Sequence, residues 1–97
     1  MRIAEVIVSS ETEQKLISKH GVHVYEVEEL FQARPLIEFV EKGRLRGQNV
    51  YIALGQSEGG RYLGVFFIDK GRGKALVISA RDMDAKERKH YGKVRKK

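Results

Sequence analysis

The feature that most constrains the fold is a series of four apolar runs of strand length in the second part of the chain. Three glycine-containing turn clusters separate these runs, at residues 42–47, 57–60 and 69–73. Connections this short place neighbouring strands antiparallel. The third run is apolar on both faces, which predicts a central position in the sheet. The predicted strands are Leu36–Val40, Val50–Leu54, Tyr62–Ile68 and Ala75–Ala80.

The remaining segments predict one further strand and three helices. Ile3–Val8 is rich in valine and isoleucine, as strands are. The two serines at 9–10 are suitable N-caps for a first helix, which ends at Gly21. Apolar residues at helical spacing predict a second helix that ends before Pro35. A capping-box spacing that starts at Asp84 begins the last helix.

The order of these elements predicts an α+β fold. We expect a small antiparallel sheet with two N-terminal helices and one C-terminal helix. The chain has 97 residues, which is enough for one domain with a modest core. We assign residues 1–92 to this domain and residues 93–97 to a basic C-terminal tail.

The charge is unevenly distributed along the chain. Residues 1–41 hold four Lys/Arg and eight Asp/Glu, whereas residues 42–97 hold fifteen Lys/Arg and five Asp/Glu. A basic half favours polyanionic partners such as RNA, and the alternative is a solubilising surface. There is no apolar stretch of membrane-spanning length and no cysteine, so we expect a cytoplasmic protein without a thiolate metal site.

Arg81 is the first candidate site residue, because it lies at the end of the last predicted strand. Strand alternation places it on one face with Ser79 and Val77. An arginine in this position can bind phosphate oxygens bidentately and stabilise charge on a phosphoryl group. The alternative is a structural ion pair with Asp82, Asp84 or a glutamate of the second helix.

Lys19 and His20 end the first helix. Lys19 is explained by the favourable interaction of a cation with the C-terminal end of the helix dipole. For His20 there are two alternatives, a structural role or a role as general acid or base. Arg61, Arg44 and Arg46 lie next to turns and either contact phosphates or are solvated. The carboxylates around Met83 fit helix capping better than metal binding, and we expect no metal or cofactor.

The order of several short motifs resembles the BrnT family of ribonuclease toxins. The most specific are Lys-His-Gly-Val at 19–22 and the Ile-Ser-Ala-Arg segment at 78–81, which is followed by Glu87-Arg88 and Tyr91. Between them stand Tyr-Ile-Ala-Leu-Gly at 51–55 and Gly-Arg-Tyr-Leu at 60–63. The resemblance covers about residues 16–91.

The resemblance implies a RelE-like fold, metal-independent RNA cleavage and inhibition of translation. It also implies a cognate, BrnA-like antitoxin, and the complex of the two proteins represses its own operon. The family's basic positions fall on Lys19, His20, Arg61 and Arg81, and Glu87 and Tyr91 follow in the closing helix. Such a site would stabilise charge with Arg61 and Arg81 and transfer protons through Lys19, His20 or Tyr91.

The basic closing helix adds Arg88 and Lys89 to Arg44 and Arg46 as RNA-binding candidates. The chain also departs from the usual family pattern. Val8, Ser9, Thr12 and Leu16 replace a tryptophan, an aspartate, a lysine and an asparagine, and Gln48-Asn49 replaces a Glu-Arg pair. The alternatives to an active toxin are therefore a non-catalytic RNA- or ribosome-binding module and an inactive homologue that acts through a protein partner.

Overall fold

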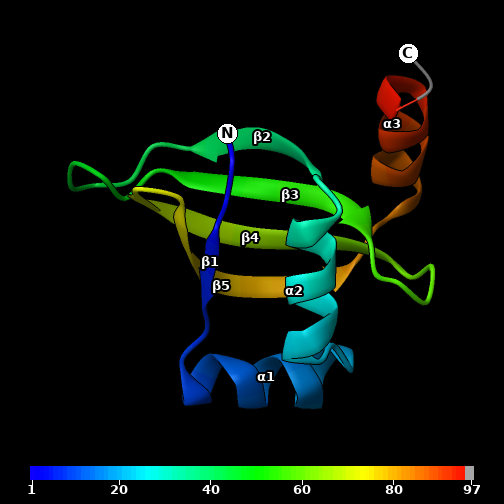
Figure 1. Ribbon diagram of the computed structural model, residues 1–97, viewed down its shortest axis with the longest axis horizontal. Coiled ribbons are helices and arrows are strands. Elements are labelled where there is room, and N and C mark those ends of the chain that lie inside the picture. The colour runs from blue at the N-terminus through cyan, green and yellow to red at the C-terminus, as the bar shows by residue number, and fades with distance from the viewer. Residues whose placement is uncertain (96–97) are drawn as a thin grey trace.

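The computed structural model describes residues 1–95 and contains one five-stranded sheet and three helices (Figure 1). Two helices precede the run of four strands and one follows it, so the predicted α+β class and the order of elements are confirmed. The elements are β1 (Glu5–Ile7), α1 (Ser10–His20), α2 (Val24–Gln32), β2 (Leu36–Glu41), β3 (Val50–Gln56), β4 (Tyr62–Gly71), β5 (Lys74–Asp82) and α3 (Ala85–Arg95).

The strand order in the sheet is β1-β5-β4-β3-β2, so β4 is central as predicted. The strands β2 to β5 pair antiparallel because short turns connect them. β1 instead pairs parallel with β5, which makes the sheet mixed rather than wholly antiparallel. The antiparallel prediction fails for β1 because it lies beside a strand far away in sequence, so no hairpin sets its direction.

The two faces of the sheet carry separate hydrophobic cores. The larger core joins α1 and α2 to one face through Leu16, Leu30 and Phe67. The smaller core lies on the other face, where Tyr91 of α3 packs with Leu54. In Figure 1 α2 lies in front of the sheet and α1 runs below it, whereas α3 projects above the right-hand end of the sheet. We call these the α1/α2 face and the α3 face.

A β-bulge in β5 changes which side chains share a face. The pairing of β4 with β5 shifts between Phe66 and Phe67, and Ile78 is left without a partner. Val77 therefore packs in the core of the α1/α2 face, whereas Ser79 lies opposite Phe66 on the α3 face. The prediction that Val77, Ser79 and Arg81 share one face is wrong for Val77.

Both predicted caps that begin helices are present. The Ser9 side chain accepts a hydrogen bond from the Thr12 N–H at the start of α1. Asp84 and Glu87 form a reciprocal capping box at the start of α3, with bonds of 2.8 and 2.9 Å. α3 continues through residues 93–95, which the sequence assigned to the tail, and the remaining tail residues 96–97 lie outside the described part of the chain. No helix in residues 1–95 is long and apolar enough to cross a membrane.

Candidate functional site

The guanidinium group of Arg61 lies on the α1/α2 face and joins three elements. It donates to Asp82 at 2.7 and 3.3 Å, to Glu26 at 3.2 Å, and to the carbonyls of His20 and Gly21 at 2.9 and 2.8 Å. These bonds use all five N–H donors of the side chain. Arg61 therefore holds the end of α1, the start of α2 and the end of β5 together. We call this set of residues the Arg61 cluster.

Charge reinforces the Arg61 cluster. The hydrogen bonds to Asp82 and the nearby Glu26 raise the pKa of Arg61, although burial opposes this shift. The hydrogen bond from Arg61 lowers the pKa of Asp82, and the charge of His20 lowers it further. Glu26 is only 8% exposed, so its carboxylate depends on Arg61 and on the His23 N–H. These contacts indicate that the Arg61 cluster stabilises the fold.

Lys19 and His20 lie at the exposed end of α1 beside the Arg61 cluster. His20 contributes its backbone carbonyl to Arg61. Within residues 1–95, the side chains of Lys19 and His20 make no hydrogen bond and no ion pair. The backbone of His20 therefore contacts Arg61, and Lys19 precedes it in α1.

Arg81 lies on the α3 face and has a different environment. It forms a bidentate ion pair with Glu87, with N–O distances of 2.7 and 2.9 Å, and also donates to the Asp82 carbonyl at 3.1 Å. Its guanidinium lies over the Phe66 ring, 5.3 Å from the centroid. Three of its five N–H donors have partners among the described residues, which leaves two for a ligand. The ion-pair alternative is therefore realised, but with Glu87 as the partner.

Further aromatic and basic side chains surround Arg81. Arg88 lies over the Tyr62 ring at 4.2 Å from its centroid, and Tyr91 meets the same ring edge-on at 6.2 Å. Tyr91 is 9% exposed and belongs to the smaller core. The hydrogen bond between Arg81 and Glu87 raises the pKa of Arg81 and lowers that of Glu87. We call Arg81, Glu87, Arg88, Tyr62 and Phe66 the Arg81 cluster.

The candidate residues do not form one site. Arg81 and Asp82 are consecutive in β5, so their side chains point to opposite faces of the sheet. Arg61 binds Asp82 on the α1/α2 face. Arg81 binds Glu87 on the α3 face, where Arg88 also lies over Tyr62. The expectation that Arg61 and Arg81 act on one phosphate is therefore not supported by the structure. Sequence order could not reveal this, because both arginines lie at the same end of neighbouring strands.

Two other candidates lie far from both clusters. Arg44 and Arg46 belong to the loop between β2 and β3, at the end of the sheet opposite Tyr62 and Asp82. Lys89 is exposed on α3 and, within residues 1–95, makes no ion pair. The RNA-binding candidates are therefore divided between the two ends of the sheet.

Sequence reasoning missed the pair formed by His90 and Glu38. The His90 Nε2 lies 2.7 Å from the Glu38 carboxylate, and this pair connects α3 to β2 on the α3 face. The two side chains are 47% and 40% exposed. The only sequence signal was that His90 stands between Lys89 and Tyr91, and no pattern linked it to a residue 52 positions away.

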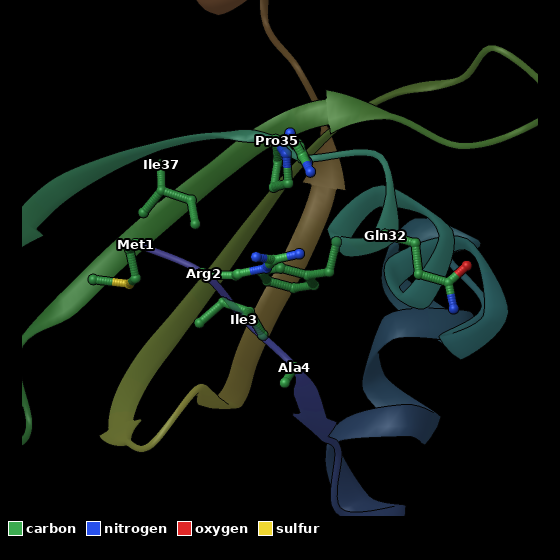
Figure 2. Close-up of a pocket in the computed structure, with 9 residues that line it drawn as sticks. Met1, Arg2, Ile3, Ala4, Gln32, Pro35 and Ile37 are labelled. Atoms are coloured by element: carbon green, nitrogen blue, oxygen red, sulfur yellow. The ribbon is translucent and has the colours of Figure 1, made fainter.

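An open cavity of about 560 Å³ lies elsewhere on the molecule. Figure 2 shows it between the N-terminal segment, which contains Arg2 and Ile3, and the segment of Pro35 and Ile37. None of the predicted site residues lines it. Residues 1–95 also contain no group of three or more His, Cys, Asp or Glu that could hold a metal ion.

Several departures from the family pattern have structural roles here. Leu16 is 2% exposed in the larger core, and Ser9 and Thr12 form the cap of α1. In the loop between β2 and β3, the Asn49 side chain accepts a hydrogen bond from the Gly43 N–H at 3.2 Å. These positions lie at α1 and in the β2–β3 loop, so none of them belongs to the Arg81 cluster.

Comparison with known proteins connects these observations to a family. A family model described as "Ribonuclease toxin, BrnT, of type II toxin-antitoxin system" matches residues 10–87. The crystal structure of the Brucella abortus ribonuclease toxin BrnT matches with a TM-score of 0.59 at 21% identity, and the match covers 82% of this chain and 96% of that one. No curated protein sequence matches. The RelE-like comparison stays a prediction. The chain belongs to the BrnT family, the ribonuclease toxins of type II toxin–antitoxin systems.

Proposed function

We propose that this toxin cleaves RNA without a metal ion, in the cytoplasm, and that the Arg81 cluster binds the scissile phosphate. The main support for this proposal is the environment of the Arg81 side chain. The Arg81 side chain is 33% exposed, is oriented by Glu87 and has two N–H donors without a partner in residues 1–95. Arg88 adds a second positive charge over Tyr62 on the same face. Cleavage of messenger RNA would inhibit translation.

The proposed reaction is attack of a ribose 2′-hydroxyl on the adjacent phosphorus. The new O–P bond forms as the P–O5′ bond breaks, which yields a 2′,3′-cyclic phosphate and a 5′-hydroxyl. One group removes the proton from the 2′-hydroxyl, and a proton returns to the leaving 5′-oxygen. Arg81 stabilises the negative charge that develops on the phosphoryl oxygens.

His90 is our candidate for proton transfer on this face. An imidazole can act as a general acid or base, and the Glu38 carboxylate orients the His90 ring. Tyr91 is less suitable because it is packed in the smaller core. Lys19 and His20 lie on the other face, so in this proposal they act outside the chemical step.

The family implies a cognate antitoxin as the protein partner. We propose that this partner is a BrnA-like protein, that it neutralises the toxin, and that operon DNA is bound only through the complex. We propose the ribosome as a further partner, because messenger RNA would be presented for cleavage there.

Expression of the chain alone in bacteria tests the proposed function. The wild type should arrest growth and shorten cellular messenger RNA, and Arg81→Ala should relieve both effects. Lys15→Ala is the matched control, because it removes a positive charge on α1 whose only ion pair within residues 1–95, with Glu11, is exposed. Normal growth and intact RNA with the wild type would contradict the proposal and favour an inactive homologue. RNA binding without cleavage would favour a non-catalytic module.

A further inference from the structure

The end of the sheet opposite the Arg81 cluster carries a second group of positive charges. β2 and β3 are joined there by residues 42–49, and β4 and β5 by the hairpin at residues 72–73. Because Glu41 pairs with Val50 and Val50 pairs with Ile68, the two connections lie side by side (Figure 1). We call this region the distal end. Its five cationic side chains are Lys42, Arg44, Arg46, Lys70 and Arg72.

These five cations are available to a ligand. All of them are exposed, and within residues 1–95 none takes part in an ion pair. Two carboxylates lie nearby, Glu41 and Asp69, and the latter accepts a hydrogen bond from the Gly71 N–H at 2.9 Å. Lys74 is left out because it pairs in register with Glu5 of β1. The distal end therefore keeps a net positive charge.

The backbone of both connections has a defined conformation. The Gly43 N–H donates to Asn49, and the Gln48 N–H donates to the Leu45 carbonyl at 3.2 Å, so the first loop is closed on itself. Arg72 stands at the tip of the hairpin with a φ of 55°. Asparagine or glycine suits that conformation better, so the turn accommodates an arginine at some conformational cost.

An exposed aromatic side chain lies beside the distal end. Phe39 is 58% exposed, two residues before the end of β2. It meets Tyr51 edge-on with ring centroids 5.8 Å apart, so one side of the ring is supported by the protein. Cationic side chains next to an exposed aromatic ring are the combination that binds single-stranded nucleic acid, because phosphates and bases are contacted together.

We propose that the distal end is a second binding surface for single-stranded RNA. The cations contact the phosphates, and Phe39, which lies with Tyr51 on the α1/α2 face, stacks on a base. An RNA strand that also reaches the Arg81 cluster on the α3 face therefore crosses the edge strand β2. The choice of RNA as the ligand rests on the function proposed above. An acidic protein segment would use the charges but would not need an exposed ring, so RNA fits the distal end better.

Binding of a fluorescent 12-nucleotide 2′-O-methyl RNA, measured by anisotropy over a range of salt concentrations, tests this proposal. Methylation removes the attacking hydroxyl, so binding is measured without cleavage. The variant R46Q/R72N should bind roughly ten-fold more weakly and have a log Kd–log salt slope about 1.4 smaller, as expected for two lost phosphate contacts. The matched control K15Q/R34N loses the same charge from α1 and the α2–β2 junction, and also places asparagine at a positive φ. It should bind like the wild type.

The aromatic contact has its own pair of variants. Phe39→Ala should weaken RNA binding about ten-fold, as expected for one lost stacked base. Tyr25→Ala removes a ring of the same exposure from α2, and should leave binding unchanged. If R46Q/R72N and Phe39→Ala bind like their controls while the wild type cleaves RNA, the distal surface is refuted and the proposed function stands.

Other outcomes separate the two proposals. If the wild type fails to cleave RNA but binds it through the distal end, only the proposed function is refuted. If R46Q/R72N binds RNA normally but no longer binds the purified antitoxin, the distal end serves the protein partner and the RNA surface is refuted. If the wild type neither binds nor cleaves RNA, both proposals fall.

Discussion

Arg61 and Arg81 lie at the same end of the sheet but differ in how their donors are used. Arg61 gives all five N–H donors to protein acceptors on the α1/α2 face. Arg81 on the α3 face gives three of its donors to Glu87 and Asp82. An arginine without free donors stabilises a fold, whereas one with free donors can also bind a phosphate. We therefore infer that Arg61 stabilises the fold on the α1/α2 face, and that Arg81 on the α3 face is the better candidate for binding an RNA phosphate.

The largest effect on stability is expected from Arg61→Ala. This change removes the partner of the buried Glu26 carboxylate and releases two backbone carbonyls. We expect a loss of about 2–3 kcal/mol, reduced from the value for a fully buried pair because Arg61 is 29% exposed. The melting temperature should fall by about 10–20 °C. Equal melting temperatures of the variant and the wild type would refute the structural role.

Glu87→Gln should have an intermediate effect. It weakens the bidentate pair with Arg81, and the amide oxygen can still accept from the Asp84 N–H. We expect a loss of about 1 kcal/mol in urea unfolding. RNA cleavage should fall more than stability does, since Arg81 loses the group that orients it. Unchanged cleavage would show that this orientation is not required.

Acid should destabilise both clusters. The pKa values of Asp82 and Glu87 are lower in the folded protein than their ordinary values. Groups of this kind stabilise the fold above the unfolded pKa of about 4, and the contribution is lost as the pH falls through the folded pKa. The urea midpoint should therefore fall between pH 6 and pH 3. The double variant Asp82→Asn/Glu87→Gln should show a smaller fall, and an equal fall would contradict this origin.

Lys19→Ala should have the smallest effect. The side chain is exposed and, within residues 1–95, makes no ion pair. We expect a stability change within about 0.5 kcal/mol and cleavage of RNA close to that of the wild type. A large loss of cleavage without a loss of stability would indicate that the chemical step takes place on the α1/α2 face.

Local patterns in the sequence were enough to predict most of the fold. The turn clusters and the serine and aspartate caps are properties of neighbouring residues, and the hairpins around β4 follow from them. The parallel pairing of β1 joins residues about 70 positions apart, so no local pattern contains it.

The candidate site was harder to predict than the fold. Motif order identified Arg61 and Arg81, but it could not assign them to faces of the sheet. The bulge at Ile78 changes the alternation in β5, and the long side chain of Arg61 reaches acceptors 40 positions away. The pairing of His90 with Glu38 depends on where α3 docks, which the apolar pattern did not specify.

Cleavage of RNA by purified Arg81→Gln and Arg61→Gln, each assayed at a temperature where it is fully folded, tests whether the Arg81 cluster and not the Arg61 cluster binds the scissile phosphate. We expect Arg81→Gln to lower the cleavage rate by about 10²-fold or more, because it removes a group that stabilises transition-state charge. Arg61→Gln should stay within about three-fold of the wild type, because a role limited to folding leaves the transition-state energy nearly unchanged. The reverse result, with Arg61→Gln inactive and Arg81→Gln active, would contradict the account.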